Sequence, residues 1–188
     1  MSKLKALTLA ALCIGLAGCA ASERAGDTTT TTPAAANKAT GAPGAMTTTS
    51  GTAVGNLAPQ FQLTQTDGGQ VSLDTLRGKP AVIVFWTAWC PLCKEEAPHI
   101  NQLAAQYETK GVRVLGINIQ DSEARTAGGV REFDIKYPVA RDADAKIAKL
   151  YKVQGTPTVI FLDKEGVIRY TGNELPKDYS TQLDALLN

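Results

Sequence analysis

The stretch FWTAWCPLCKEEAP, residues 85–98, decides the fold of this chain. A short apolar block from Ala81 to Phe85 precedes the cysteines and has the character of a strand buried on both faces. A segment with helical periodicity follows and ends near Tyr107. A strand that hands over to a helix here places the first cysteine, Cys90, at the helix N-terminus. The sequence therefore predicts a dithiol at a strand-to-helix junction.

The spacing Cys90-Pro91-Leu92-Cys93 indicates redox chemistry. The free backbone N–H groups and the positive dipole end at a helix N-terminus favour an anion, and a thiolate is such an anion. We therefore expect Cys90 to be the attacking sulfur. Pro91 suits the first helical position, where a missing N–H has no consequence. Cys93 lies one turn further in, so we expect it to be the less exposed, resolving thiol.

A lone Cys-x-x-Cys also fits a structural disulfide or half of a zinc site. Zinc requires about four ligands. The chain has a single histidine, His99, and no other cysteine in the part expected to fold, so we expect no metal and no cofactor. A strand-to-helix setting flanked by Trp86 and Trp89 favours a redox-active pair over a purely structural bridge.

The composition is that of one globular domain. The chain has 188 residues and is 44% hydrophobic, which is enough for a substantial core. The formal net charge of +1 gives no indication of nucleic-acid binding, and we expect a monomer. Of the four cysteines, Cys13 and Cys19 lie in the N-terminal segment, so the folded part is not a disulfide-stapled scaffold.

Residues 1–19 have the pattern of an export signal. Two early lysines precede an apolar stretch, residues 7–16, that is too short to span a bilayer. The segment ends in Leu-Ala-Gly-Cys, which is similar to the bacterial lipobox, where the signal is cleaved and the cysteine is lipidated. The alternative is a plain secretory signal with an incidental cysteine. We expect a lipid on Cys19 and an exported, membrane-anchored lipoprotein that faces the periplasm or extracytoplasmic space.

Residues 20–53 are rich in Thr, Ala, Pro and Gly and carry almost no large apolar side chains. Such a segment cannot build a core, so we interpret it as a disordered tether. A coil of this length has a root-mean-square reach of about 30 Å. The remaining residues, 54–188, are expected to form the folded domain.

Strand and helix signals alternate along the domain. The expected strands are residues 61–63, 71–73, 81–85, 112–120, 137–140, 159–162 and 167–170. The expected helices are residues 74–76, 91–107, 122–136, 143–151 and 177–187. This order predicts an α/β domain, a mixed sheet with helices on both faces. A Cys-x-x-Cys at the end of a strand in such a pattern is typical of a thioredoxin-like redox motif.

The chain resembles the membrane-anchored, extracytoplasmic thioredoxins of the TlpA/ResA type over residues 54–188. The resemblance rests on motifs spread along the domain: Gly55-Asn56-Leu57-Ala58-Pro59, Asp67-Gly68, Gly78-Lys79-Pro80, Trp89-Cys90-Pro91-Leu92-Cys93, Glu96 with Pro98, and Gly155-Thr156-Pro157-Thr158. It implies a thioredoxin fold, a central mixed β-sheet flanked by helices, with an N-terminal β-hairpin extension.

The resemblance also implies a function. Such proteins reduce disulfides on partner proteins outside the cytoplasm, and many act in cytochrome c maturation, where they keep haem-attachment cysteines reduced. This chain would then be a protein disulfide reductase whose partners are disulfide-bearing proteins and a membrane protein that donates electrons. Pro157 would be cis and face the disulfide, and Trp89, Pro91, Leu92 and Thr156 would contact the substrate together with it.

Glu96 is a candidate acid/base group for Cys93. The spacing of Cys93, Glu96, Ala97 and Ile100 places them on one helical face, so Glu96 is expected to point inward, one turn past the resolving thiol. A carboxyl group there suits proton exchange with a thiol. The alternative is an ordinary surface glutamate, like Glu95.

Other functions fit the same motif. Thr87 lies three residues before Cys90, as in peroxiredoxins, but position 83 is Ile where the peroxidase motif has proline. A disulfide-donating oxidase shares fold and motif, because neither determines the direction of electron flow. A copper-delivering module would need wider cysteine spacing and a distant histidine. A non-catalytic binding module would tolerate the loss of either cysteine.

Overall fold

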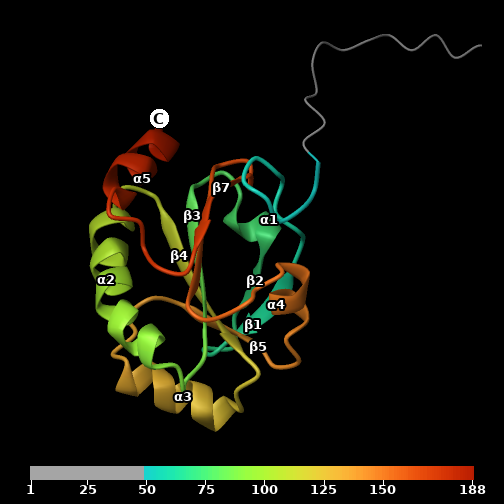
Figure 1. Ribbon diagram of the computed structural model, residues 1–188, viewed down its shortest axis with the longest axis vertical. Helices are drawn as coiled ribbons and strands as arrows, with labels where there is room; N and C mark the ends of the chain where they lie inside the picture. The colour runs from blue at the N-terminus through green and yellow to red at the C-terminus, as the bar shows by residue number, and fades with distance from the viewer. Residues whose placement is uncertain (1–48) are drawn as a thin grey trace, which may run out of the picture. The chain divides into compact units, whose positions relative to one another are not determined.

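The structure, a computed structural model, describes residues 49–188, and its centre is a seven-stranded mixed sheet (Figure 1). The order of strands across the sheet is β2-β1-β5-β4-β3-β6-β7. The strands are β1 (Gln62–Gln65), β2 (Gln70–Ser72), β3 (Ala81–Trp86), β4 (Arg113–Ile119), β5 (Val139–Asp142), β6 (Thr158–Leu162) and β7 (Ile168–Gly172). Strands β1 and β2 form the expected N-terminal hairpin at one edge, so the predicted fold is confirmed.

Helices cover both faces of this sheet. They are α1 (Leu73–Leu76), α2 (Pro91–Tyr107), α3 (Glu123–Glu132), α4 (Lys146–Leu150) and α5 (Tyr179–Leu187). Buried side chains of α2 and α5, Ile100, Leu103 and Leu183 among them, pack on one face. Leu73 of α1 and Ala148 of α4 pack on the other. Figure 1 shows these two layers on opposite sides of the strands.

Strand β3 is the centre of the core, and all six of its residues are buried. Its alternation sends Val82 and Val84 toward α2, and Ile83 and Phe85 toward the opposite layer. The strand pairs in parallel with β4 and antiparallel with β6. In the antiparallel register Phe85 lies opposite Thr158, so the end of β3 adjoins the beginning of β6. This register brings the cysteine motif and the Gly-Thr-Pro-Thr segment together.

Several predicted boundaries differ from those of the structure. The helix expected at residues 122–136 ends at Glu132, and the strand expected at residues 137–140 lies at Val139–Asp142. Two further boundaries are wrong for local reasons. The helix expected at residues 143–151 begins only at Lys146, because Ala145 has a left-handed backbone (φ 55°) and the carboxylate of Asp142 accepts the amides of Ile147 and Ala148 instead. Strand β2 ends at its third residue, Ser72, which caps α1 through the amide of Thr75. The cap makes the next residue helical.

The described unit also includes residues ahead of position 54. The amide of Leu57 donates to the carbonyl of Thr49 at 3.1 Å, and the amide of Gly51 donates to the carbonyl of Leu57 at 2.9 Å. The expected signal, residues 1–19 with Cys19, and most of the expected tether lie outside the described residues. Among residues 49–188, no helix combines the length and the apolar character needed to cross a membrane.

Candidate active site

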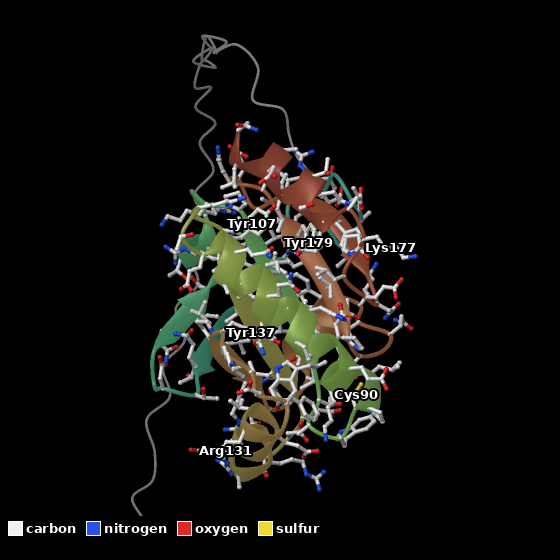
Figure 2. All side chains as sticks on the ribbon, turned by 90° about the vertical axis from the view of Figure 1, so that its left-hand side faces the viewer. Cys90, Tyr107, Arg131, Tyr137, Lys177 and Tyr179 are labelled. Carbon is white, nitrogen blue, oxygen red and sulfur yellow. The ribbon has the colours of Figure 1, made fainter. Side chains whose placement is uncertain are left out.

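Cys90 lies at the junction that the sequence predicts. It is the N-cap of α2, with φ −89° and ψ 113°, and the helix begins at Pro91. The amide of Cys93 donates to Cys90 Sγ, with 3.2 Å between nitrogen and sulfur. Figure 2 shows Cys90 and Tyr107 at opposite ends of α2. A sulfur that accepts a backbone N–H at a helix N-terminus is held where negative charge is favoured.

The two thiols are free and both are buried. The exposed fractions are 5% for Cys90 and 4% for Cys93, so the expected difference in exposure between them is absent. The reason is tertiary, because the segment before β6 covers Cys90. Burial, together with the hydrogen bond to Cys90, raises the pKa of the Cys93 thiol to about 12.

The segment before β6 faces Cys90. The peptide bond between Thr156 and Pro157 is cis, as the family resemblance implies. The Cys90 thiol donates to the carbonyl of Thr156 at 3.2 Å, and the hydroxyls of Thr156 and Thr87 are 3.5 Å apart. Pro157 is buried and Thr156 is half-buried. The cysteine turn and the proline segment therefore form one site.

Exposed apolar side chains flank Cys90 in the sequence. Trp89 is 68% exposed and Leu92 is 62% exposed, although both are large and hydrophobic. Pro91 between the cysteines is also exposed. Leu150, 45% exposed, lies on α4, on the other layer of the sheet. Exposed apolar residues that gather at one place are a common mark of a binding surface.

Glu96 points inward, as its helical spacing predicts, and its side chain is only 14% exposed. Its Oε1 accepts the amide of Leu175 at 2.7 Å, and its Oε2 lies 3.2 Å from His99 Nδ1. Glu96 also lines a small cavity of about 10 Å³ together with Cys93 and Pro157. Glu96 and the resolving thiol thus share one small cavity, and the direct partners of the carboxylate are Leu175 and His99.

The sequence reasoning missed a polar cluster behind the cysteine turn. Asp121 follows β4, and its Oδ2 accepts the amide of Ala88 at 2.7 Å and the side-chain amide of Asn118 at 2.9 Å. Asn118 in turn accepts the hydroxyl of Thr126 at 2.7 Å. The sequence did carry a signal for this cluster. Asn118 is a polar residue near the end of the largely apolar strand β4, Asp121 follows that strand, and β4 pairs with β3, the strand that leads to the cysteines. Polar residues at such strand ends commonly belong to a site.

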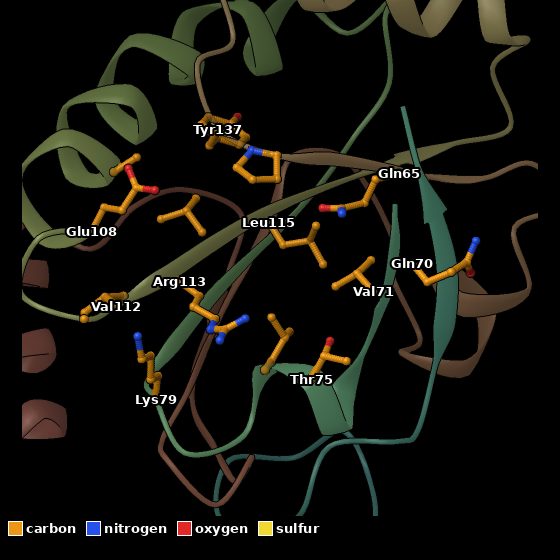
Figure 3. Close-up of a pocket in the computed structure, with 15 residues that line it drawn as sticks. Gln65, Gln70, Val71, Thr75, Lys79, Glu108, Val112, Arg113, Leu115 and Tyr137 are labelled. Carbon is orange, nitrogen blue, oxygen red and sulfur yellow. The ribbon is translucent and has the colours of Figure 1, made fainter. Parts of the chain in front are cut away.

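A second cavity, of about 360 Å³, lies near the hairpin and the start of β4 (Figure 3). Thr75, Lys79, Glu108 and Arg113 are among the residues that line it. None of the predicted site residues belongs to this lining, so the cavity is separate from the dithiol. Within residues 49–188, no three side chains of His, Cys, Asp or Glu gather in a way that could hold a metal ion.

The fold and the dithiol together define a thioredoxin-fold redox protein. Residues 54–171 match the AhpC/TSA family, and the chain belongs to that family. It is 35% identical over 115 residues to the thiol-disulfide oxidoreductase ResA of Bacillus cereus, a match that covers 61% of this chain and 66% of the relative, just under two thirds. It is 30% identical over 136 residues to ResA of Geobacillus kaustophilus, covering 71% of this chain and 78% of the relative.

Solved structures agree with these relatives. A thiol:disulfide interchange protein DsbE from Chlorobium tepidum superposes with a TM-score of 0.64 and 28% identity, covering 70% of this chain and 95% of that one. A secreted Mycobacterium tuberculosis disulfide oxidoreductase homologous to DsbE gives 0.57 and 29%, covering 68% and 94%. The resemblance to ResA-type proteins and the predicted class, a thiol-disulfide oxidoreductase of the thioredoxin fold, are confirmed.

Proposed function

We propose that this protein reduces disulfides of partner proteins outside the cytoplasm through the Cys90/Cys93 dithiol. The observation that carries the proposal is the pair of unlike thiols in the motif. Cys90 Sγ accepts a backbone N–H at the start of α2, whereas burial raises the pKa of Cys93 to about 12. At neutral pH Cys93 is therefore a poor nucleophile until a disulfide forms beside it.

The reaction then has two steps. The Cys90 thiolate attacks one sulfur of the partner disulfide, which forms a mixed disulfide and releases the other partner sulfur as a thiolate that takes up a proton. Cys93 next loses its proton and attacks Cys90 Sγ, which releases the second partner thiol and leaves a Cys90–Cys93 disulfide. Two electrons pass to the partner. A membrane dithiol protein must return them before the next turnover.

Glu96 is the candidate acceptor for the Cys93 proton. Glu96 lines the same small cavity as Cys93, and the hydrogen bond from the amide of Leu175 fixes the position of its carboxylate. General bases of this kind contribute about 10²-fold to 10⁴-fold in rate.

The partner is proposed to dock on the apolar rim of the dithiol. Trp89 and Leu92 offer exposed apolar surface on both sides of Cys90. Pro91 adds to this surface, and the Thr156-Pro157 segment lies against the sulfur. An extended peptide that crosses the rim would bring its disulfide to the buried Cys90 sulfur.

Trapping experiments test the order of the thiols. A Cys93→Ala variant is expected to accumulate mixed disulfides with partner proteins through Cys90, detected by non-reducing electrophoresis and mass spectrometry. A Cys90→Ala variant is expected to accumulate none. Trapping through Cys93 in the second variant, without trapping in the first, would reverse the roles.

Equilibration with glutathione tests the direction of electron flow. A reduction potential well below about −200 mV supports a reductase, whereas a value near about −120 mV marks an oxidant. A peroxidase would instead consume hydrogen peroxide with a thiol donor and would retain that activity in the Cys93→Ala variant. A binding module would keep its partner affinity in both cysteine variants.

We further propose that Cys19 carries a lipid and that residues 20–53 tether the domain to a membrane. The lipobox-like end of residues 1–19 supports this anchor, and the secreted Mycobacterium tuberculosis structural relative supports an extracytoplasmic location. Incorporation of a labelled fatty acid is expected in the full chain and is expected to vanish in a Cys19→Ala variant. Unlabelled, freely soluble protein from the intact chain would contradict the anchor.

The proposed substrates include the haem-attachment cysteines of c-type cytochromes, which have the pattern Cys-x-x-Cys-His. This choice comes from the resemblance to ResA-type proteins. The test compares the rate at which the dithiol reduces an oxidised Cys-x-x-Cys-His peptide with the rate for a peptide of the same length whose histidine is replaced. Equal rates for the two peptides would mean that the protein is a general disulfide reductase without a preference for haem-attachment motifs.

A further inference from the structure

The turn that leads into Cys90, residues 87–90, is held by a residue that lies outside the Cys-x-x-Cys motif. Within the turn, the amide of Cys90 donates to the carbonyl of Thr87 at 3.2 Å. The carboxylate of Asp121 also holds the turn, because its Oδ2 accepts the backbone amide of Ala88 at 2.7 Å. Asp121 follows β4, 33 residues later, so this is a tertiary contact.

Asp121 is itself buried and held in place. Its exposed fraction is 5%, and its Oδ2 also accepts the side-chain amide of Asn118 at 2.9 Å. Asn118 is 1% exposed and accepts the hydroxyl of Thr126 on α3 at 2.7 Å. A buried polar chain in which each member has a partner is rigid, and a buried carboxylate without partners would be unfavourable.

Helix α3 also packs closely against the turn. A side chain added at Gly129 of α3 would come within 2.7 Å of Ala88 Cβ and 2.9 Å of Trp86 Cζ3. Arg141 of β5 donates to the Asp121 carbonyl at 3.3 Å. The turn before Cys90 is therefore fixed by β4, α3 and β5 together.

We propose that Asp121 is a positioning residue for Cys90. Its carboxylate holds the Ala88 amide and so fixes the turn two residues before Cys90. The fixed turn places Cys90 Sγ where it accepts the Cys93 amide and lies beside the Thr156 carbonyl. Loss of the carboxylate leaves the half-buried N–H of Ala88 without its acceptor, which favours a relaxed turn. The sulfur then loses its alignment with the start of α2.

This proposal deepens the proposed function, since it concerns the nucleophile of that reaction, but it can be tested without a partner. The probe is iodoacetamide, which alkylates a thiolate directly. The rate for Cys90 is measured against pH in a Cys93→Ala background, so that one thiol reports. We expect Asp121→Ala to lower the rate at pH 7 about tenfold, because the sulfur is no longer held on the Cys93 amide, and to change the pH profile of alkylation.

Two control variants separate positioning from a general loss of stability. Asp142 is also buried, 1% exposed, and accepts two backbone amides, but these belong to α4. Asp142→Ala is expected to lower the urea midpoint of unfolding and leave the alkylation profile unchanged. Asp121→Asn keeps an oxygen for the Ala88 amide and is expected to restore most of the rate.

Three results would overturn the proposal. They are an unchanged profile in a folded Asp121→Ala variant, an equal change in Asp142→Ala, and no recovery in Asp121→Asn. If Asp121→Ala does not fold, Thr126→Val decides, because it removes only the hydroxyl that holds Asn118. We expect it to slow alkylation about threefold, and an unchanged rate counts against the proposal. Failure of partner reduction with a normal alkylation profile would instead contradict the proposed function alone.

Discussion

The side-chain amide of Asn173 donates a hydrogen bond to the carbonyl of Pro157, with 3.0 Å between nitrogen and oxygen. Two residues further along the chain, the amide of Leu175 donates to Glu96 Oε1 at 2.7 Å. The loop between β7 and α5 thus touches the site at two points. One point is the proline segment beside Cys90, and the other is the carboxylate one turn past Cys93. The last part of the chain therefore belongs to the site, although it contains none of the motif residues.

The first prediction concerns Glu96. Glu96→Gln retains the shape of the side chain and its contact with Leu175 but cannot accept a proton from Cys93. We expect the reduction of partner disulfides at neutral pH to slow by about 10²-fold. Stopped-flow fluorescence of single-turnover exchange measures this rate.

Glu95 provides the matched control for Glu96, because it is its exposed neighbour on α2. Glu95→Gln removes the same charge and is expected to leave the exchange rate within about twofold of the unmodified protein. Equal slowing in the two variants would mean that the loss of one negative charge, and not proton transfer by Glu96, slows the exchange. No slowing in either would remove Glu96 from the mechanism.

The second prediction concerns the two adjacent glycines of α3. A methyl group at Gly129 meets Ala88 and Trp86 at less than 3 Å, whereas nothing lies within 4 Å of one at Gly128. We expect Gly129→Ala to lower the free energy of unfolding by about 1–3 kcal/mol, because the core there cannot give way. Gly128→Ala is expected to raise it by up to about 1 kcal/mol through helix propensity.

Urea unfolding at neutral pH measures both glycine variants. The two variants are directly comparable, because the same Gly→Ala substitution is made at adjacent positions of one helix. A similar sign of change in the two would show that the close approach of α3 to the cysteine turn is not a constraint.

The third prediction concerns alkaline pH. Burial raises the pKa of Cys93 from 9.0 to about 12 and raises the pKa of Tyr137 and of Tyr151 above their ordinary value. In the folded state these groups keep their protons at a pH where the unfolded chain loses them. Stability from this source is complete below about pH 9 and is lost as the pH rises through the folded-state values.

The measurement is the urea midpoint of the reduced protein between pH 7 and pH 11. We expect a fall that begins near pH 9 and steepens above pH 10, where tyrosine also titrates in the unfolded chain. A Cys93→Ala variant is expected to show a smaller fall between pH 9 and pH 10. A midpoint that rises with pH in this window would contradict the burial argument.

The fourth prediction concerns the apolar rim. Trp89→Ala and Leu92→Ala each remove exposed apolar surface beside Cys90. We expect each to raise the KM for a protein disulfide about tenfold, equivalent to about 1.4 kcal/mol, with little change in stability. Alkylation of Cys90 by iodoacetamide is expected to stay unchanged, because a small reagent does not use the rim.

Leu150 is the control for the rim, as an exposed leucine on α4 in the other layer of the sheet. Leu150→Ala is expected to leave KM unchanged. A rise in KM in this variant equal to that in Leu92→Ala would mean that exposed apolar area contributes wherever it lies. The rim would then have no special role in docking.

The elements that local sequence signals control could be predicted closely. Helix α2 runs from Pro91 to Tyr107 as expected, because its cap, its proline and its apolar spacing all lie within the element. Strand β3 was likewise recognisable from its continuous apolar run. The wrong start of α4 also has a local cause, but a left-handed residue such as Ala145 carries no sequence signal of its own.

The parts of the site that depend on distant contacts could not be predicted. Helical spacing gives the inward direction of Cys93 and Glu96, but the burial of Cys90 comes from Thr156, 66 residues away. The partner of Glu96 is a backbone amide 79 residues away, and a backbone amide has no residue type that a sequence could display. Register across the sheet, which no local pattern contains, decides these contacts.

Strand β3, with neighbours on both sides and helices on both faces, has a consequence for how long the site keeps its shape. Local opening of a protein is easiest at its edges and ends, whereas central strands exchange their amide hydrogens only when the whole domain unfolds. The amides of Val84 and Phe85 are therefore expected to be among the slowest to exchange in the molecule. The cysteine turn begins directly after this strand, so the geometry of the dithiol persists as long as the domain stays folded.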